Sequence, residues 1–497
     1  MRRGLALRVV VALTAAGLSS ATAFAVDGQP GKAAKVEGYR YGFPFGAGDV
    51  AAAASGDSGE TEIGDGTAML TADAWELPGT ATGDRPLLLA QAAAPSQGAT
   101  PEGGYLEVPR DQTVRERPRP EVEPLGIHVG SFFTYPSVTI TEFYNDNVFA
   151  TSSNKKGDFI TEISPDLQVK SDWNNHALNF DVGAASGFYA DNTDEDYTDY
   201  HALADGRLDI TRDHQLTAGL GYRHEHLDRT SPDNIQSAKE PVTYDLYTAA
   251  LGNRNQFGRF TVEINGELDR YDYSDVQAVG GGTIDYDQLD RIATTGSAKV
   301  SYEIVPDYHA YLRTTYNNQR YDGIVPTTGL DKDSQGYEAV AGMAIDLGGI
   351  TRADVFAGYQ QQFYEDSSLG TIEGPSGGAS LTWNVTGITT VNASLTRTLA
   401  QTIVPGAAGY YSTDAKLSVD HELLRNLLLN VFGEYDNRDY QGINRTDEVW
   451  SAGAGAQYLM NRYVWLTGNY RFDQRNSDAG GQDYNRNVFL VGIKLQM

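Results

Sequence analysis

The chain of 497 residues contains no cysteine. This absence excludes disulfide bonds, metal–thiolate sites, cysteine nucleophiles and a lipid anchor on an N-terminal cysteine. Positive charge is also scarce, because 38 lysine and arginine residues stand against 66 aspartate and glutamate residues and leave a formal net charge of −28. Nucleic acid is therefore not an expected partner.

Long apolar stretches are missing beyond the first 25 residues, so no membrane-spanning helix is expected there. At the N-terminus, three arginines precede or interrupt an apolar stretch that ends at Ala16, and Ala23-Phe24-Ala25 places small residues at a cleavage point. The apolar stretch is shorter than the roughly 20 residues that a spanning helix needs. Residues 1–25 are therefore predicted to be a signal peptide for export in the unfolded state.

Residues 26–125 show no sustained hydrophobic period and are rich in Gly, Ala, Ser, Thr and acidic residues. The segment ends in a proline cluster formed by Pro109, Pro118, Pro120 and Pro124. Such a composition predicts a disordered periplasmic arm that ends in a stiff linker.

Strict alternation of apolar and polar residues begins near Ser131 and predicts β-strands with one apolar face. Between residues 260 and 269, the apolar positions are Phe260, Val262, Ile264, Gly266 and Leu268, and the intervening positions are polar. The last strand carries its apolar face on Phe489, Val491, Ile493, Leu495 and Met497. A chain that ends on such a strand is typical of outer-membrane barrels, where the last strand closes on the first.

Residues 126–497 are therefore predicted to form an all-β, transmembrane antiparallel β-barrel. Eight short turns alternate with nine longer polar stretches, which gives about eighteen strands, with sixteen as the alternative if one hairpin is miscounted. Short turns on the periplasmic side and long loops outside place both termini of the chain in the periplasm.

Several motifs resemble the outer-membrane "beta-barrel porin 2" family of alphaproteobacteria. The motifs are Leu125-Gly126-Ile127, Tyr135-Pro136, Tyr144-Asn145-Asp146-Asn147-Val148-Phe149-Ala150, Lys156-Gly157-Asp158-Phe159-Ile160 and Leu208-Asp209-Ile210-Thr211-Arg212. The resemblance implies a porin-like barrel, a link of some members to exopolysaccharide or capsule systems, and no catalytic residue.

A barrel of eighteen strands is wide enough for a water-filled lumen. The inward face of the expected strands carries nine acids and four arginines. These lumen-lining candidates are Asp181, Asp205, Arg207, Asp209, Arg223, Glu225, Glu263, Glu267, Asp269, Arg313, Asp354, Arg471 and Asp473. Because acids predominate, the sequence predicts a preference for cations, unless the charges pair with one another.

Aromatic residues are also expected on the inward face, namely Tyr189, Tyr247, Tyr311, Phe356, Phe432 and Trp465. They suit either a path for sugar rings or the interfacial girdles in which barrels enrich tyrosine. His224-Glu225-His226 lacks a further metal ligand, and His421-Glu422 lacks the second histidine of a zinc-protease motif. No enzyme activity, metal or cofactor is predicted.

The leading hypothesis is a passive channel for small hydrophilic solutes in the outer membrane of a Gram-negative bacterium. An accessory component of exopolysaccharide or capsule secretion and a structural or adhesive barrel with a blocked lumen are the alternatives. The expected partners are membrane lipid, lipopolysaccharide and the barrel-assembly machinery, together with a periplasmic polysaccharide-export partner under the second hypothesis.

Overall fold

A computed structural model describes residues 110–235, 237–324 and 329–497. The expected signal peptide and residues 26–109 of the expected arm lie outside the described residues. In the described part, no helix combines the length and the apolar character needed to cross a membrane.

Within the described residues, one antiparallel sheet contains 19 strands, of which β1 (Ile127–Val129) is a short addition to the edge of its neighbour. The remaining eighteen strands form the wall, so the prediction of eighteen strands is confirmed. In chain order, these are β2 (Phe132–Asn145), β3 (Asp158–Ser171), β4 (Ala177–Tyr189), β5 (Tyr197–Thr211), β6 (His214–His226), β7 (Thr243–Phe257), β8 (Phe260–Tyr273), β11 (Arg291–Val305), β12 (Tyr308–Tyr321), β13 (Ser334–Leu347), β14 (Thr351–Tyr364), β15 (Thr371–Thr386), β16 (Thr389–Ala400), β17 (Gly409–Leu424), β18 (Leu427–Gln441), β19 (Thr446–Asn461), β20 (Val464–Ser477) and β21 (Tyr484–Gln496).

Each strand pairs with its neighbours in sequence, and the last strand closes the barrel on the first. β21 pairs with β20 on one side and with β2 on the other, where Ile140 lies opposite Ile493. Closure leaves the wall without an unpaired edge, which is the requirement for a sheet that crosses lipid.

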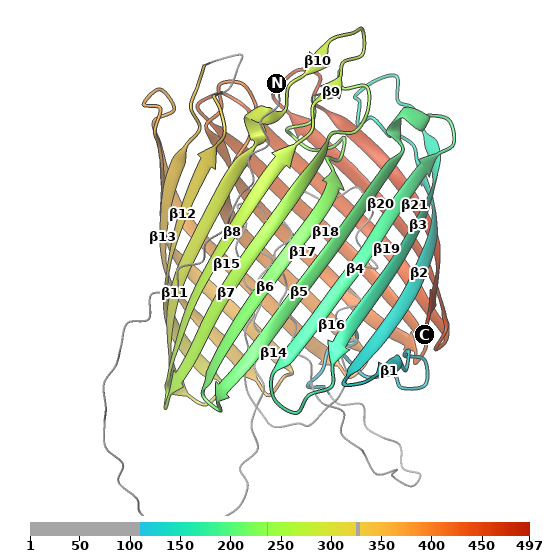
Figure 1. The fold of residues 1–497 in the computed structure, drawn as a ribbon, viewed down its shortest axis with the longest axis vertical. Helices are drawn as coiled ribbons and strands as arrows, with labels where there is room; N and C mark the ends of the chain where they lie inside the picture. Colours follow the sequence, from blue (N-terminus) through green and yellow to red (C-terminus); the bar gives the residue numbers. More distant parts are fainter. Residues whose placement is uncertain (1–109, 236, 325–328) are drawn as a thin grey trace, which may run out of the picture. The chain divides into compact units, whose positions relative to one another are not determined.

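Short connections and long connections lie at opposite ends of the barrel (Figure 1). The short turns share their end with β1 and the C-terminus, whereas the other end carries the 3-10 helices η2 (Thr193–Glu195) and η3 (Asp287–Leu289) and the hairpin of β9 (Val276–Gln277) and β10 (Thr283–Ile284). We call these the turn end and the loop end.

Side chains alternate between the outer face and the lumen along each strand. In β8, Phe260, Ile264 and Leu268 are about half exposed on the outer face, while Glu263 and Glu267 lie on the opposite face. In β21, Phe489 and Val491 are exposed in the same way. In a membrane barrel, lipid covers the exposed apolar band that runs around the outside of the closed sheet.

One predicted inward aromatic residue is on the other face. Tyr247 of β7 is 47% exposed on the outer surface, beside Tyr222 of β6 at 5.0 Å between ring centroids. The prediction was wrong because both faces of β7 are apolar: Tyr244 and Leu246 are buried under loops on the inner side. In this strand, the alternation of apolar and polar residues therefore does not show which face points into the lumen.

Candidate functional site

The candidate site is the lumen together with the segments that lie at its two ends. The structure places all thirteen lumen-lining candidates on the face of the wall opposite the exposed apolar side chains. Their role in selecting ions stays a prediction, but their partners show how the charge is distributed.

Part of the acidic charge is paired with arginine. Asp473 accepts hydrogen bonds from Arg471 at 2.6 Å and from Arg486 at 2.8 Å, and it is almost fully buried. Arg207 lies 3.0 Å from Asp209. Two of these pairs join residues two positions apart in one strand, and Asp473 lies opposite Arg486 on the neighbouring strand, so they neutralise charge locally along the wall.

Longer contacts join other candidates to basic residues. Glu263 is 3.9 Å from Arg254, and Glu225 is 4.0 Å from Arg223. Arg313 is 3.3 Å from Glu338, a wall residue that was not among the predicted candidates.

Other acids are hydrogen-bonded to neutral groups. Asp205 accepts from the Asn179 amide at 2.8 Å, and Asp269 accepts from the Thr248 hydroxyl at 2.7 Å. The Tyr311 hydroxyl donates to Asp354 at 2.8 Å. A neutral donor stabilises a carboxylate without cancelling its charge. Cations also lie near two of these acids, with Arg223 and Arg291 close to Asp269 and Arg313 and Lys299 close to Asp354. Glu267 is buried on the same face of β8 as Asp269.

The histidines of the His224-Glu225-His226 stretch do not converge on one point. His224 contacts Asp245 at 2.8 Å beside the outward Tyr200, whereas His226 contacts Asp199 at 2.9 Å and stacks on Tyr197. Since the two imidazoles bind different carboxylates, this stretch does not form a metal site.

The connection between β6 and β7, residues 227–242, spans the loop end of the lumen. Asp233 accepts hydrogen bonds from the Thr402 hydroxyl at 2.6 Å and from the backbone N–H of Ile403 at 2.9 Å. Thr402 follows β16, and β16–β17 and β6–β7 lie on nearly opposite sides of the eighteen-strand wall. On another part of the wall, Arg475 of β20 donates to the Thr230 carbonyl at 3.1 Å. These contacts hold the connection across the mouth.

A buried lysine holds the segment after β16 to which the β6–β7 connection binds. Lys332, which is almost fully buried, donates to the carbonyl oxygens of Thr402 and Ala407. Burial lowers the pKa of Lys332 to about 8, and the charge of Asp233 opposes that shift. The two carbonyl acceptors explain how an ammonium group is accommodated where water is excluded.

An apolar cluster joins the β6–β7, β8–β11 and β16–β17 connections at the loop end, and we call these three connections the cap. Val242, Tyr286 and Ile403 are buried together from three different connections, with Tyr271, Tyr273 and Leu289. The Tyr286 hydroxyl accepts the N–H of Ile235 at 3.0 Å, and burial raises the pKa of Tyr286 to about 12. The cap therefore has a packed core rather than only surface loops.

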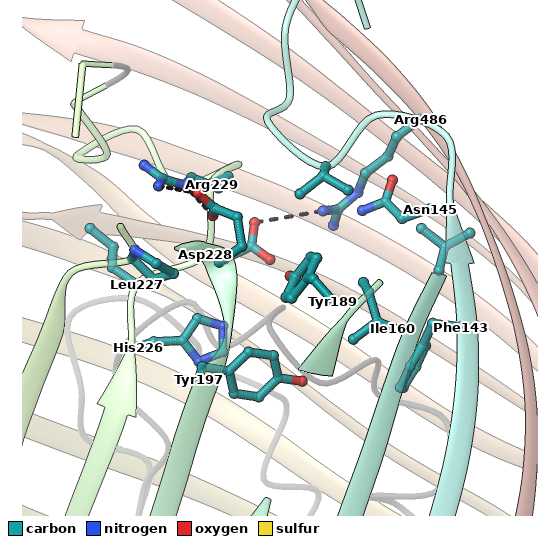
Figure 2. A pocket seen from close by; sticks show the side chains of 14 residues that line it. Phe143, Asn145, Ile160, Tyr189, Tyr197, His226, Leu227, Asp228, Arg229 and Arg486 are labelled. Atoms are coloured by element: carbon teal, nitrogen blue, oxygen red, sulfur yellow. Dashed lines mark hydrogen bonds and ion pairs between the residues drawn. The ribbon is translucent and has the colours of Figure 1, made fainter. Parts of the chain in front are cut away.

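Where the cap meets the wall, a cavity of about 50 Å³ remains. Figure 2 shows Tyr189, Tyr197 and His226 facing Asp228, Arg229 and Arg486 across it. Arg229 is paired with Glu195 at 2.6 Å, and Asp228 lies 3.7 Å from Arg486. The cavity has room for only a few water molecules, which is too small for a sugar or a similar solute.

We expect an epitope tag inserted between Gly281 and Gly282, at the tip of the β9–β10 hairpin, to be labelled on intact cells. A tag between residues 230 and 241 should instead reduce the amount of folded protein, because Ala238 and Val242 are buried in the cap. A tag at Arg212-Asp213, in a short turn, is the control and should be labelled only after permeabilisation. Labelling of the turn tag on intact cells would show that the orientation is inverted.

The turn end of the lumen is occupied by residues 110–124, which we call the strap. Arg117 and Arg119 both donate to Glu422 of β17, at 2.8 and 2.7 Å, and all three side chains are buried. Arg115 donates to Asp420, two residues earlier on the same inward face, at 2.7 Å. Burial lowers the pKa of each of these arginines, and the acids of β17 offset part of that cost.

Apolar and backbone contacts also hold the strap. Val114 and Val122 pack with Leu428, Leu459 and Trp465, and the Trp465 indole donates to the Val122 carbonyl at 3.1 Å. Gly349 has a φ of +70°, and a Cβ there would lie 2.6 Å from the Asp111 carbonyl oxygen, so only glycine allows this approach. The expected boundary at residue 125 therefore does not mark where contact with the barrel begins.

Sequence reasoning missed the strap and several inward wall residues, among them Asp166 and His201. The signal for the strap was the alternation of Arg115, Arg117 and Arg119 in an otherwise acidic arm. No local signal pointed to Asp166, which directly follows a proline, or to His201.

A family model described as "Putative beta-barrel porin 2" matches residues 119–497. Among solved structures, the chain is similar to Pseudomonas aeruginosa OpdL, at 14% identity and a TM-score of 0.40, covering 74% of this chain and 100% of that chain. It is also similar to Pseudomonas aeruginosa OccK2 (OpdF) in complex with glucuronate, at 12% identity and a TM-score of 0.42, covering 73% and 98%. A search of curated proteins gave no match.

Proposed function

This chain belongs to the beta-barrel porin 2 family of the outer membrane, and from that premise we propose that it is a passive channel for small hydrophilic solutes that prefers cations. The observation that carries the preference is the set of lumen acids whose hydrogen-bond donors are neutral. Asp205, Asp269 and Asp354 accept hydrogen bonds from an amide, a hydroxyl and a phenol. Their charges add to the field inside a low-dielectric wall, which attracts cations.

The paired acids support the proposal less strongly. Where arginine lies beside a carboxylate, as at Asp209 and Asp473, the pair contributes a dipole and little net charge. The selectivity is therefore expected to be moderate and to depend on the acids of β5, β8 and β14.

Purified protein in a planar bilayer under a salt gradient should conduct, with a reversal potential of the sign that cation flow produces. The triple variant Asp205→Asn, Asp269→Asn, Asp354→Asn should move the reversal potential towards zero or beyond. Both effects should shrink in 1 M salt, where the screening length falls to about 3 Å. The Glu142→Gln variant is the control, because Glu142 is exposed on the outer face of β2 and its charge lies outside the lumen.

An anion preference of the wild-type protein would contradict the argument from lumen charge. Absence of conductance would contradict the open channel, and it would favour the second candidate, an accessory component of exopolysaccharide secretion. The observation behind this second candidate is that described segments lie at both ends of the lumen: the cap at the loop end and the strap at the turn end. A polymer-export component would need such segments to open only with its periplasmic partner.

A further inference from the structure

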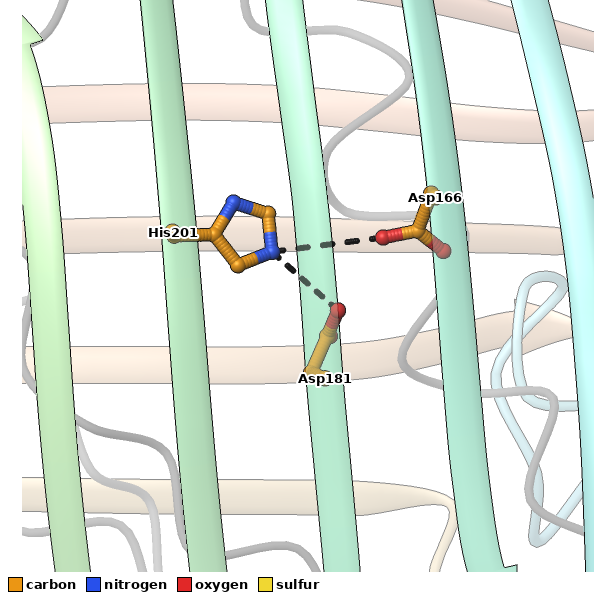
Figure 3. Close-up of side chains that lie close together, drawn as sticks. All are labelled: Asp166, Asp181 and His201. Atoms are coloured by element: carbon orange, nitrogen blue, oxygen red, sulfur yellow. Dashed lines mark hydrogen bonds and ion pairs between the residues drawn. The ribbon is translucent and has the colours of Figure 1, made fainter.

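Three neighbouring strands place metal-ligating side chains together on the lumen wall. Asp166 of β3, Asp181 of β4 and His201 of β5 point towards one another, as Figure 3 shows. The Nε2 atom of His201 lies 3.1 Å from Oδ1 of Asp181 and 3.9 Å from Oδ2 of Asp166. All three side chains are about one-quarter to one-third exposed, so they are reached from the lumen.

The register of the strands creates this group. Asp166 lies opposite Gly183, and Gly183 lies opposite His201, so the three residues form one row across β3, β4 and β5. A Cβ at position 183 would lie 2.6 Å from Cε1 of His201 and 3.1 Å from Oδ2 of Asp166. The glycine therefore leaves the space over which the imidazole and the carboxylate approach each other, and Asp181 closes the group from two residues along β4.

The donor set and the spacing suit a borderline divalent cation. Three ligands at zinc distances of 2.0–2.1 Å in a tetrahedron are separated by roughly 3.4 Å. The three donor atoms here all lie within 4.8 Å of one another, which small side-chain rotations would bring to that value. Of the three groups in the described residues with such spacing, this is the one that contains a histidine; the others contain only carboxylates. Imidazole selects zinc, nickel and similar ions over magnesium and calcium.

We propose that Asp166, Asp181 and His201 form a binding site for Zn²⁺ or a similar transition-metal cation, with its remaining coordination position open to the lumen. Lys494 and Lys170 interact electrostatically with Asp166 and Asp181, so the net charge of the group is small. Because only three ligands hold the ion and two lysines lie nearby, binding should be weak enough for the ion to exchange. An ion that passes through a channel must be able to leave such a site. The site goes beyond the proposed channel function, since binding is measured without any ion flow.

The test is a calorimetric titration of the full-length purified protein in detergent with Zn²⁺, in excess Mg²⁺ to occupy the carboxylate-only groups. Wild-type protein should bind one Zn²⁺. The His201→Asn and Asp181→Asn variants should each bind Zn²⁺ at least tenfold more weakly than the wild type. Gly183→Ala keeps every ligand, and it should weaken binding to a similar extent because the methyl group separates His201 from Asp166. His309→Asn, which removes a histidine of β12, is the matched control and should bind as the wild type does.

Heat-modifiable mobility, in which a folded barrel migrates faster before boiling, identifies the variants that are folded and fit to compare. Wild-type affinity in a folded His201→Asn or Gly183→Ala variant would overturn the proposal, and so would the absence of Zn²⁺ binding by the wild type. Loss of conductance with intact Zn²⁺ binding would contradict only the channel function, so the two proposals fail separately.

Discussion

Replacing Glu422 with Gln is expected to release the strap from the turn end of the lumen. Glu422 accepts charge-assisted hydrogen bonds from Arg117 and Arg119, and all three side chains are buried. Loss of the single carboxylate removes the ion-pair partner that the two buried guanidinium groups share. Breaking a buried ion pair from one side costs about 3–5 kcal/mol, which shifts the bound state of the strap by a hundredfold or more.

The absence of native cysteine makes this release measurable. Val114 of the strap is almost fully buried against the wall, so a Val114→Cys probe should react slowly with a maleimide in an otherwise wild-type barrel. In the Glu422→Gln background, the reaction should be at least tenfold faster. If the strap narrows the path of solutes, single-channel conductance should rise in the same variant.

A control must remove an acid of the same lumen without touching the strap. Glu434→Gln does so, because Glu434 lies on the neighbouring strand β18, 3.9 Å from Lys416, and both side chains are partly exposed. An exposed pair contributes about 1 kcal/mol or less, so the probe should stay protected. Equal labelling of Val114→Cys in the Glu422→Gln and Glu434→Gln backgrounds, with both barrels folded, would show that the arginine contacts do not hold the strap.

The strap illustrates why part of this structure could not be predicted from the sequence. Proline at positions 118, 120 and 124 predicts a segment without regular structure, and in the described residues 110–125 no strand or helix begins before β1. Its location depends on acids about 300 residues later in the chain, on β17. Composition describes the local backbone, but it contains no information on such a distant contact.

The wall was predictable because its determinants are local. In β8, the alternation of Ile264 and Leu268 with Glu263 and Glu267 identifies both the strand and its faces. Each short turn interrupts that pattern within a few residues, so counting turns gave eighteen strands. Where a loop buries the inner face, as over Leu246 in β7, both faces become apolar and the assignment of Tyr247 failed.

The contacts between side chains in the lumen could be predicted only in part. Parity placed Asp181 on the inner face, but the proximity of Asp181 to His201 depends on the register between β4 and β5. Register follows from turn lengths and from packing across strands, neither of which a single strand reveals. The identity of its partners therefore needed the structure, although the inward direction of Asp181 did not.

The outer face gives the second large effect. Leu312 lies near the middle of β12 and is 65% exposed, so it faces the hydrocarbon region in the membrane. Leu312→Arg should lower the unfolding free energy in lipid vesicles by about 2–4 kcal/mol, which is the cost of arginine near the bilayer midplane. Urea titration, read by the fraction of heat-modifiable folded barrel, measures this change.

Thr315→Arg places the same side chain on the other face of the same strand. Thr315 lies opposite Glu338 of β13 in the lumen, where the native Arg313 already contacts that carboxylate. The new guanidinium group would therefore remain in water beside an acid, and its free-energy cost should be under about 1 kcal/mol. The contrast depends only on which face meets lipid, so equal destabilisation by the two variants would mean that β12 does not cross the membrane in this register. A large loss for Leu312→Arg alone would show that the exposed apolar belt is the lipid contact on which the barrel depends.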